Sequence, residues 1–157
     1  MSTSSGDISP IPTPAADAVP PTRRQRQAGA ALTGVAVLFL AVDTTVKVLN
    51  LPPAVEATTE LGYPASSVRW IGLIQMACLA LYVAPRTSAL GAVLLTGYLG
   101  GAVATHVRVG NPLFSHTLFP VYVGVLVWAG LYLRDRRLGM LLPLRRTGTG
   151  ARFGGSN

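Results

Sequence analysis

The sequence predicts an all-α integral membrane protein in which four membrane-spanning helices form a bundle. Half of the 157 residues are hydrophobic and only 12% are charged, whereas a soluble domain carries about 25% charged residues. The apolar residues are gathered in four long runs. A soluble helical bundle is the competing interpretation, but four such runs would leave it almost no charged surface to face water.

The apolar runs predict spans at about 28–49, 67–84, 89–109 and 117–133. With their links they define a four-span membrane domain over 28–146. The Ser-, Pro- and Ala-rich start, residues 1–27, predicts a disordered tail, because it cannot bury enough apolar surface to offset its ordering entropy. The Gly-rich end, residues 147–157, predicts a flexible C-terminal tail, and an amphipathic piece at 138–144 is expected on the membrane surface.

Turn residues indicate how the runs are joined. Pro52 and Pro53 can open a helix, and Gly62 and Pro64 can end it, which predicts a short interfacial helix after the first span. Pro85 ends the second span. The link that follows is so short that the second and third spans are expected to be antiparallel neighbours.

The basic residues predict the orientation in the membrane. Ten of them lie in the termini and the link after the second span, and three lie in the other two links with their helix ends. The two groups are Arg23, Arg24, Arg26, Arg86, Arg134, Arg136, Arg137, Arg145, Arg146 and Arg152, against Lys47, Arg69 and Arg108. This excess predicts that both termini are cytoplasmic. A cleaved export signal would also begin with arginines, but the apolar run continues to Leu51, so an uncleaved first span is expected.

The third span carries a stripe of small residues on one helical face. Its members are Thr96, Gly97, Gly100, Gly101, Ala104 and Thr105. Glycine inside a helix costs about 1 kcal/mol in water, and in a membrane small residues let helix backbones approach closely. We therefore expect helix packing along this stripe, with the other segments packed around the third span.

Asp43 is the carboxylate expected inside the first span, and Lys47 follows at the i, i+4 spacing that puts both on one helix face. Counting helix rise inward from the outer ends places Gln75, Gly101 and about Gly124 in the same layer. Arg108 continues the small stripe, so we expect it, and not only Lys47, to neutralise Asp43. The pair is either purely structural or part of a ligand site.

Other chemistries find little support. Cys78 is the only cysteine, so paired-thiol chemistry is excluded. His106, which is expected to face away from the small stripe, and His116 could suggest zinc together with Glu56 and Glu60, but no tight ligand spacing supports it, and no metal site is predicted. No Ser/His/Asp set, phosphate-binding loop or haem motif occurs. The net charge of +7 follows the edges of the spans, not a basic face with interleaved aromatic residues, so nucleic-acid binding is not expected.

Several segments resemble the DoxX-like family of small four-span bacterial membrane proteins. They are the Asp43-x-x-x-Lys47 pair, Leu-Gly-Tyr-Pro at 61–64, Pro-Arg-Thr at 85–87 and Thr-Gly-Tyr-Leu-Gly-Gly-Ala-Val-Ala-Thr-His at 96–106. The resemblance covers about 27–145. It implies the bacterial cytoplasmic (inner) membrane and a relation to membrane redox complexes, since the family name comes from a subunit associated with thiosulfate:quinone oxidoreductase. Most members have no assigned activity.

From the resemblance and the polar residues we expect a small membrane subunit of a quinone-linked redox system. It would have no intrinsic cofactor and would bind a quinone or lipid-like molecule in the outer half of the bundle. The expected ligand-binding residues are Asp43, Lys47, Gln75, Tyr98, His106 and Arg108. The chain is not expected to be an enzyme on its own, and a membrane or soluble oxidoreductase, or further copies of itself, would be its partners. A non-enzymatic membrane scaffold is the alternative, and a small-solute carrier is less favoured because no discontinuous helix pair is evident.

Overall fold

The computed structural model describes residues 22–134, and within this range the chain is helical without strands. Its elements are α1 (Arg23–Val48), α2 (Pro52–Glu60), α3 (Ser67–Val83), α4 (Ser88–Arg108), the π-helical turn η1 (Leu113–Thr117) and α5 (Phe119–Arg134). Three segments are long and apolar enough to cross a membrane, namely α1, α4 and the continuous stretch Leu113–Arg134, whereas α3 is a shorter apolar helix. The chain is therefore an all-helical membrane protein. Most of the expected N-terminal tail and all of 138–144 and 147–157 lie outside the described residues.

The helix ends follow the local signals in the sequence, with one difference at the start. α1 begins at Arg23, so residues 23–27 are helical and do not belong to the expected tail. A capping box explains this early start. The Thr22 side chain accepts a hydrogen bond from the backbone N–H of Gln25 (3.3 Å), and the Gln25 side-chain oxygen accepts one from the backbone N–H of Thr22 (2.8 Å). α2 has proline in its first turn, and Gly62 (φ 82°) follows its end.

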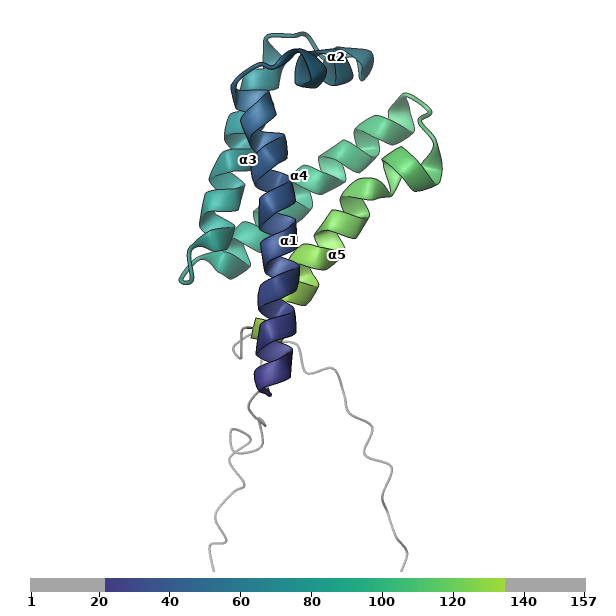
Figure 1. The fold of residues 1–157 in the computed structure, drawn as a ribbon. Coiled ribbons are helices and arrows are strands. Elements are labelled where there is room, and N and C mark those ends of the chain that lie inside the picture. Colours follow the sequence, from purple (N-terminus) through teal and green to yellow (C-terminus); the bar gives the residue numbers. More distant parts are fainter. Residues whose placement is uncertain (1–21, 135–157) are drawn as a thin grey trace, which may run out of the picture.

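The four long helices pack as a ring in which α1 lies between α3 and α5. α4 closes the ring by packing against both α3 and α5. Figure 1 shows the short α2 lying across one end of α1, and α4 and α5 forming a hairpin that tilts away from α1 toward the same end. The expectation that the other segments pack around the third span is thus corrected, because α4 is one member of a ring in which no helix is central.

The core lies between these helices and contains one polar anchor. Leu40, Leu95 and Leu131 are fully buried there, together with Tyr82 of α3. The Tyr82 hydroxyl donates a hydrogen bond to the Val127 carbonyl of α5 (2.9 Å). This bond joins α3 to α5 across the ring, since the two helices are not neighbours.

Close helix approach depends on glycines outside the predicted stripe. A Cβ atom on Gly91 would lie 2.2 Å from the Tyr82 nitrogen, and one on Gly130 would lie 2.9 Å from the Thr33 nitrogen. Both sites bring one backbone against another, where no side chain could yield. Gly91 therefore sets the contact of α4 with α3, and Gly130 sets that of α5 with α1.

The small stripe of α4 faces outward from the chain. Nothing lies within 4 Å of a Cβ atom added to Gly97, Gly100 or Gly101, and of the predicted stripe only Thr105 is buried. The inward face of α4 consists instead of larger apolar residues such as Leu95 and Leu99. The expected stripe packing is corrected within this chain, because in lipid both faces of a helix are apolar and polarity does not mark the inner one.

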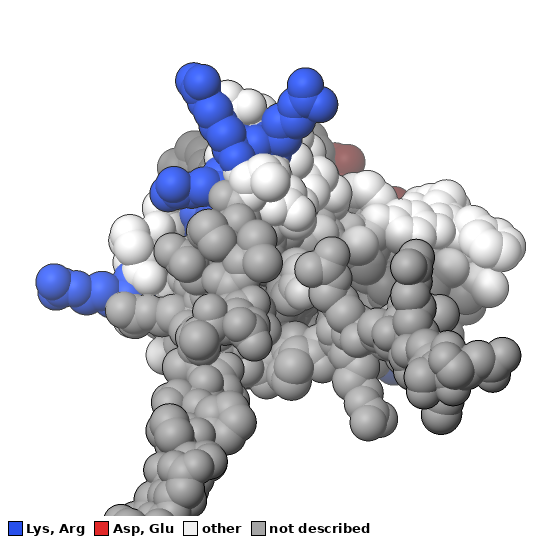
Figure 2. Space-filling view, turned by 90° about the horizontal axis from the view of Figure 1, so that it is seen from below, with Lys and Arg blue, Asp and Glu red and all other residues white. Residues whose placement is uncertain are grey.

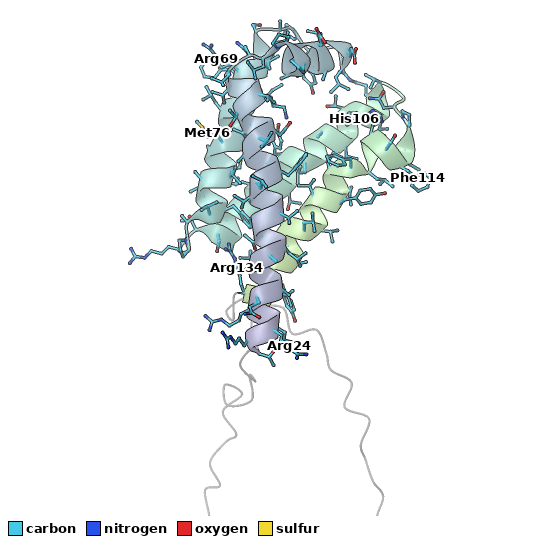
Figure 3. All side chains as sticks on the ribbon, in the orientation of Figure 1. Arg24, Arg69, Met76, His106, Phe114 and Arg134 are labelled. Atoms are coloured by element: carbon cyan, nitrogen blue, oxygen red, sulfur yellow. The ribbon has the colours of Figure 1, made fainter. Side chains whose placement is uncertain are left out.

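The two ends of the described structure differ in charge. Arg23, Arg24 and Arg26 stand at the start of α1, and Arg86 and Arg134 lie at the same end, which has no acidic residue among those described. Viewed from this end, the basic side chains project from the described surface (Figure 2). Figure 3 places Arg24 and Arg134 at this end and Arg69 and His106 at the opposite one.

Candidate functional site

Four of the expected site residues form one hydrogen-bonded cluster near the α2 end. Lys47 pairs with Asp43 one turn before it in α1. Gln75 of α3 donates from Nε2 to Asp43 Oδ2 (2.8 Å), and its Oε1 accepts a bond from the Tyr98 hydroxyl of α4 (2.7 Å). Lys47 Nζ also lies 3.3 Å from Gln75 Oε1 and 3.4 Å from Tyr98 Oη. Three helices are thereby joined through side chains.

The cluster is buried at Gln75 and accessible at the ion pair. Gln75 has no exposed surface, and its Nε2 also lies 3.4 Å from the Leu40 carbonyl. The side chains of Lys47 and Asp43 are 18% and 31% exposed. Within residues 22–134, both hydrogen bonds to the Asp43 carboxylate are accepted by Oδ2. Oδ1 can therefore still accept a hydrogen bond. The cluster can thus offer polar groups to a ligand without losing its own bonds.

A pocket of about 260 Å³ adjoins the cluster. Its walls come from α1, α2, α3, α4 and the loop after α2, and they consist of Lys47, Thr58, Leu61, Tyr63, Ile71, Tyr98, Gly101, Ala102, Thr105 and His106. Lys47 and Tyr98 bring the polar cluster into this wall, while Ile71 and Ala102 contribute apolar surface. Such a mixture of mostly apolar lining with a few placed polar groups is typical of small-molecule sites.

A second cavity, of about 550 Å³, lies under α2 and reaches the carboxylate. It is lined by Asp43, Val46, Lys47, Pro53, Ala54, Ala57, Thr58, Glu60, Leu61, His106, Val109, Asn111 and His116. It shares Lys47, Thr58, Leu61 and His106 with the smaller pocket, so these four residues stand between the two spaces. Its charged and polar wall suits water at the outer end of the helices.

The loop after α2 is fastened to the last turns of α4. The Tyr63 hydroxyl and Thr105 Oγ1 are 2.9 Å apart, and Arg108 Nη2 donates to the Leu61 carbonyl (2.8 Å). The Arg108 guanidinium also lies over the Tyr63 ring, 5.7 Å from its centre. The predicted pairing of Arg108 with Asp43 is therefore wrong. Lys47 is the cation at Asp43, and Arg108 is exposed on the outward side of α4 and bonds to the loop.

His106 lines both cavities. It was predicted to face away from the small stripe, but only part of the stripe is turned away from it: Gly97 and Gly100 are exposed on the outward side, whereas Gly101 and Thr105 line the same pocket as His106. The ring centres of His106 and His116 are 6.1 Å apart. His106 Nδ1 lies 2.8 Å from the side-chain nitrogen Nδ2 of Asn111. Among residues 22–134 no group of three or more His, Cys, Asp or Glu side chains could hold a metal ion.

The two glycines that were predicted to share a layer with Asp43 lie beside different cavities. Gly101 lines the pocket beside Tyr98. Gly124 instead lines an apolar groove of about 460 Å³ on the other side of α4, between α4 and α5. There the Trp128 indole donates to Thr96 Oγ1 (2.8 Å). Gly124 is therefore no part of the space beside Asp43.

Two polar residues of the pocket wall, Tyr63 and Thr58, were not expected from the sequence as site residues. Tyr63 is part of the Leu-Gly-Tyr-Pro segment, where it follows the glycine that ends α2, and Thr58 is buried on the inner side of α2. Proximity of Tyr63 to a helix-ending glycine was the one available signal. Its contact with Thr105, 42 positions away in the sequence, has no local signature.

Comparison with known proteins identifies one family. The model of the DoxX-like family matches residues 31–130, a range that includes every residue of the polar cluster and of both cavities. No curated protein and no solved structure matches the chain.

Proposed function

Because this chain belongs to the DoxX-like family, we propose that it is a four-span protein of the bacterial inner membrane with both termini in the cytoplasm. In this proposal its outer half binds a quinone or lipid-like molecule, as a small subunit of a quinone-linked redox system. Electrons would come from a partner oxidoreductase, since neither a paired thiol nor a haem motif occurs in the sequence.

The closed ring of four helices supports four spans. α3 has 17 residues, or about 26 Å at ~1.5 Å per residue, slightly less than the hydrocarbon thickness of a bilayer. Arg69 and Trp70 are exposed in its first turn, where long basic and aromatic side chains can reach the interface and cover the difference. The arginine-rich end would then be the cytoplasmic one.

The polar cluster beside the pocket is the observation that carries the ligand proposal. A charged residue inside a span costs about 2.5–3.5 kcal/mol on insertion scales, and a helix can be built without it. Asp43 and Lys47 neutralise each other but keep part of their surface open to the cavities. This arrangement favours an uncharged ligand with oxygen atoms, to which Lys47 and Tyr98 can donate and from which Asp43 can accept.

The test is native mass spectrometry of the full-length protein purified in mild detergent from quinone-replete membranes. We expect bound quinone on the native chain and on Glu56→Gln, whose carboxylate is exposed and lines neither cavity. Asp43→Asn should lower the occupancy about ten-fold, or ~1.4 kcal/mol, while the protein stays folded. Native protein that carries no quinone would contradict the proposal.

A scaffold function is the second candidate, and the outward small stripe of α4 favours it. Exposed glycines on a membrane helix permit close packing by another helix, and none in the described chain fills that place. Under this alternative the same mass spectra would show an oligomer or a partner complex that Gly97→Leu disrupts and Asp43→Asn leaves intact.

A further inference from the structure

We propose that the 260 Å³ pocket receives its ligand sideways from the bilayer, through a mouth at Gly101 between α3 and α4. The pocket would admit only the head group of a lipid-soluble, uncharged amphiphile. This inference rests on the ligand-binding function proposed above and adds to it the route of entry and the residue that controls it.

The outer end of the pocket is closed by the loop after α2. Tyr63 is held to Thr105, and Arg108 is held to the Leu61 carbonyl and lies over the Tyr63 ring. Tyr63, Leu61 and Thr58 form this part of the wall. A ligand entering from water past the loop would have to break these two side-chain hydrogen bonds, and one entering through the 550 Å³ cavity would have to pass between side chains that line both spaces, among them Lys47 and His106.

The side of the pocket between α3 and α4 has no such closure at Gly101. This glycine lines the pocket and is also exposed on the outward face of α4. No atom lies within 4 Å of a Cβ atom added there. Gly101 stands seven residues before Arg108 in α4, which is about 10 Å along the helix at ~1.5 Å per residue. The opening therefore faces the apolar part of the bilayer and not the head-group region.

The size of the pocket limits what it can enclose. Sites that hold a whole drug-sized molecule have volumes of about 300–1,000 Å³, and this pocket measures about 260 Å³. It can hold one ring or a similar head group. A long apolar tail would have to remain outside the pocket, in the surrounding lipid.

The polar groups of the wall define the chemistry of that head group. Lys47 lines the pocket and Asp43 does not, but the Lys47 ammonium is already paired with the Asp43 carboxylate, so the wall offers hydrogen-bond donors and no unpaired charge to a charged ligand. Lys47 Nζ and the Tyr98 hydroxyl can donate to a carbonyl oxygen, as in a quinone ring. The 550 Å³ cavity on the other side of Lys47 and His106 is lined by Asp43, Glu60 and His116, and this polar wall suits water better than an apolar ring.

Two glycine substitutions on the same exposed face test the mouth. Gly101→Leu should place its side chain across the opening, and Gly97→Leu, about one turn away, is the matched control, because Gly97 is equally open but lines no part of the pocket. We would measure binding of a benzoquinone with a ten-carbon tail to full-length protein in lipid nanodiscs. Gly101→Leu should weaken binding on the order of ten-fold, and Gly97→Leu should leave it within about two-fold.

A second measurement reports the route without any quinone. With Cys78 replaced by serine, Ala102→Cys puts a single thiol in the pocket wall. A lipid-soluble maleimide should label it, a membrane-impermeant charged maleimide should not, and adding Gly101→Leu should suppress the labelling. Labelling by the charged reagent, or equal loss of quinone binding in both glycine variants, would overturn the lateral route. Absence of quinone binding in the native protein, with labelling as expected, would refute the proposed ligand and leave the mouth supported.

Discussion

Lys47 is the residue on which the polar cluster depends. Its ammonium group lies within hydrogen-bonding distance of Asp43, Gln75 and Tyr98 at once, and it also lies 5.9 Å from the centre of the Tyr98 ring. Tyr98 and Gln75 are further joined to each other. Replacing Lys47 therefore removes contacts with residues on α1, α3 and α4. The main effect is that Asp43 loses its positively charged partner.

We predict that Lys47→Met destabilises the protein by about 1–3 kcal/mol. This is less than the 3–5 kcal/mol typical of breaking a fully buried pair, because both side chains are partly exposed. Asp43→Asn should cost less, and the double variant should be more stable than Lys47→Met alone. Thermal unfolding in detergent measures all three, and a double variant as unstable as the sum of the singles would show that the two charges do not interact.

The reassignment of Arg108 gives a separate prediction. Because Arg108 bonds to the Leu61 carbonyl and not to Asp43, the effects of Arg108→Gln and Asp43→Asn on stability should add within about 0.5 kcal/mol. Arg69→Gln, also exposed at this end, is the control for loss of a surface arginine. A coupling above ~1 kcal/mol between Arg108 and Asp43 would restore the ion pair expected from the sequence.

Among the helices, α4 carries glycines in two different environments, one against a neighbouring helix and one at the surface of the chain. At Gly91 the helix touches the backbone of α3, whereas at Gly97 the same helix meets nothing within the chain. Identical residues two turns apart thus serve different purposes. The first is required for intramolecular packing, and the second leaves space at the surface.

Alanine substitutions should separate these two kinds. Gly91→Ala places a Cβ atom 2.2 Å from the Tyr82 nitrogen, so α3 and α4 must move apart, at a cost of about 2 kcal/mol or more. Gly97→Ala should leave stability unchanged or raise it by up to ~1 kcal/mol, because alanine favours helix more than glycine does. Thermostability followed by size-exclusion chromatography compares the variants. Equal losses at both positions would contradict the outward assignment of the stripe.

The sequence predicted the helices better than their faces. Helix ends depend on local residues, here the prolines at the start of α2, Gly62 after its end and Pro85 after α3. The Asp43–Lys47 pair likewise follows from a local feature, the i, i+4 spacing. Counting helix rise also placed Gln75 at the depth of Asp43. The inward face of α4 was missed, because its outward residues are as apolar as its inward ones. This one error, about which face of α4 points inward, led to both wrong predictions: helix packing along the small stripe and pairing of Arg108 with Asp43.

For the whole molecule, the difference in charge between the two ends is the strongest guide to orientation. Among residues 22–134 one end carries arginines, which project in Figure 2, with no acidic residue of this range beside them in the sequence, and the other end mixes Lys47, Arg69 and Arg108 with Asp43, Glu56 and Glu60. The positive-inside rule predicts that the first end faces the cytoplasm. This prediction concerns the entire chain and does not depend on which ligand the pocket takes.

Single cysteines at the two ends test the orientation. In the Cys78→Ser background, Ser115→Cys lies at the α2 end and Ala84→Cys at the arginine-rich end, and both positions are exposed. A membrane-impermeant maleimide added to intact spheroplasts should label Ser115→Cys and leave Ala84→Cys unlabelled until the membrane is broken. The reverse pattern would mean that the chain inserts the other way round.

The short link between α3 and α4 also has a consequence for biogenesis. α3 has 17 residues and carries the fully buried amide of Gln75, whose hydrogen-bond partners Tyr98 and Asp43 lie on α4 and α1. Thr87 Oγ1 donates to the Leu81 carbonyl across the link (2.8 Å), and Gly91 lies directly against Tyr82. We therefore expect the two helices to insert into the membrane as one hairpin, in which Gln75 can already bond to Tyr98 of α4, whereas its bond to Asp43 forms when α1 packs beside them.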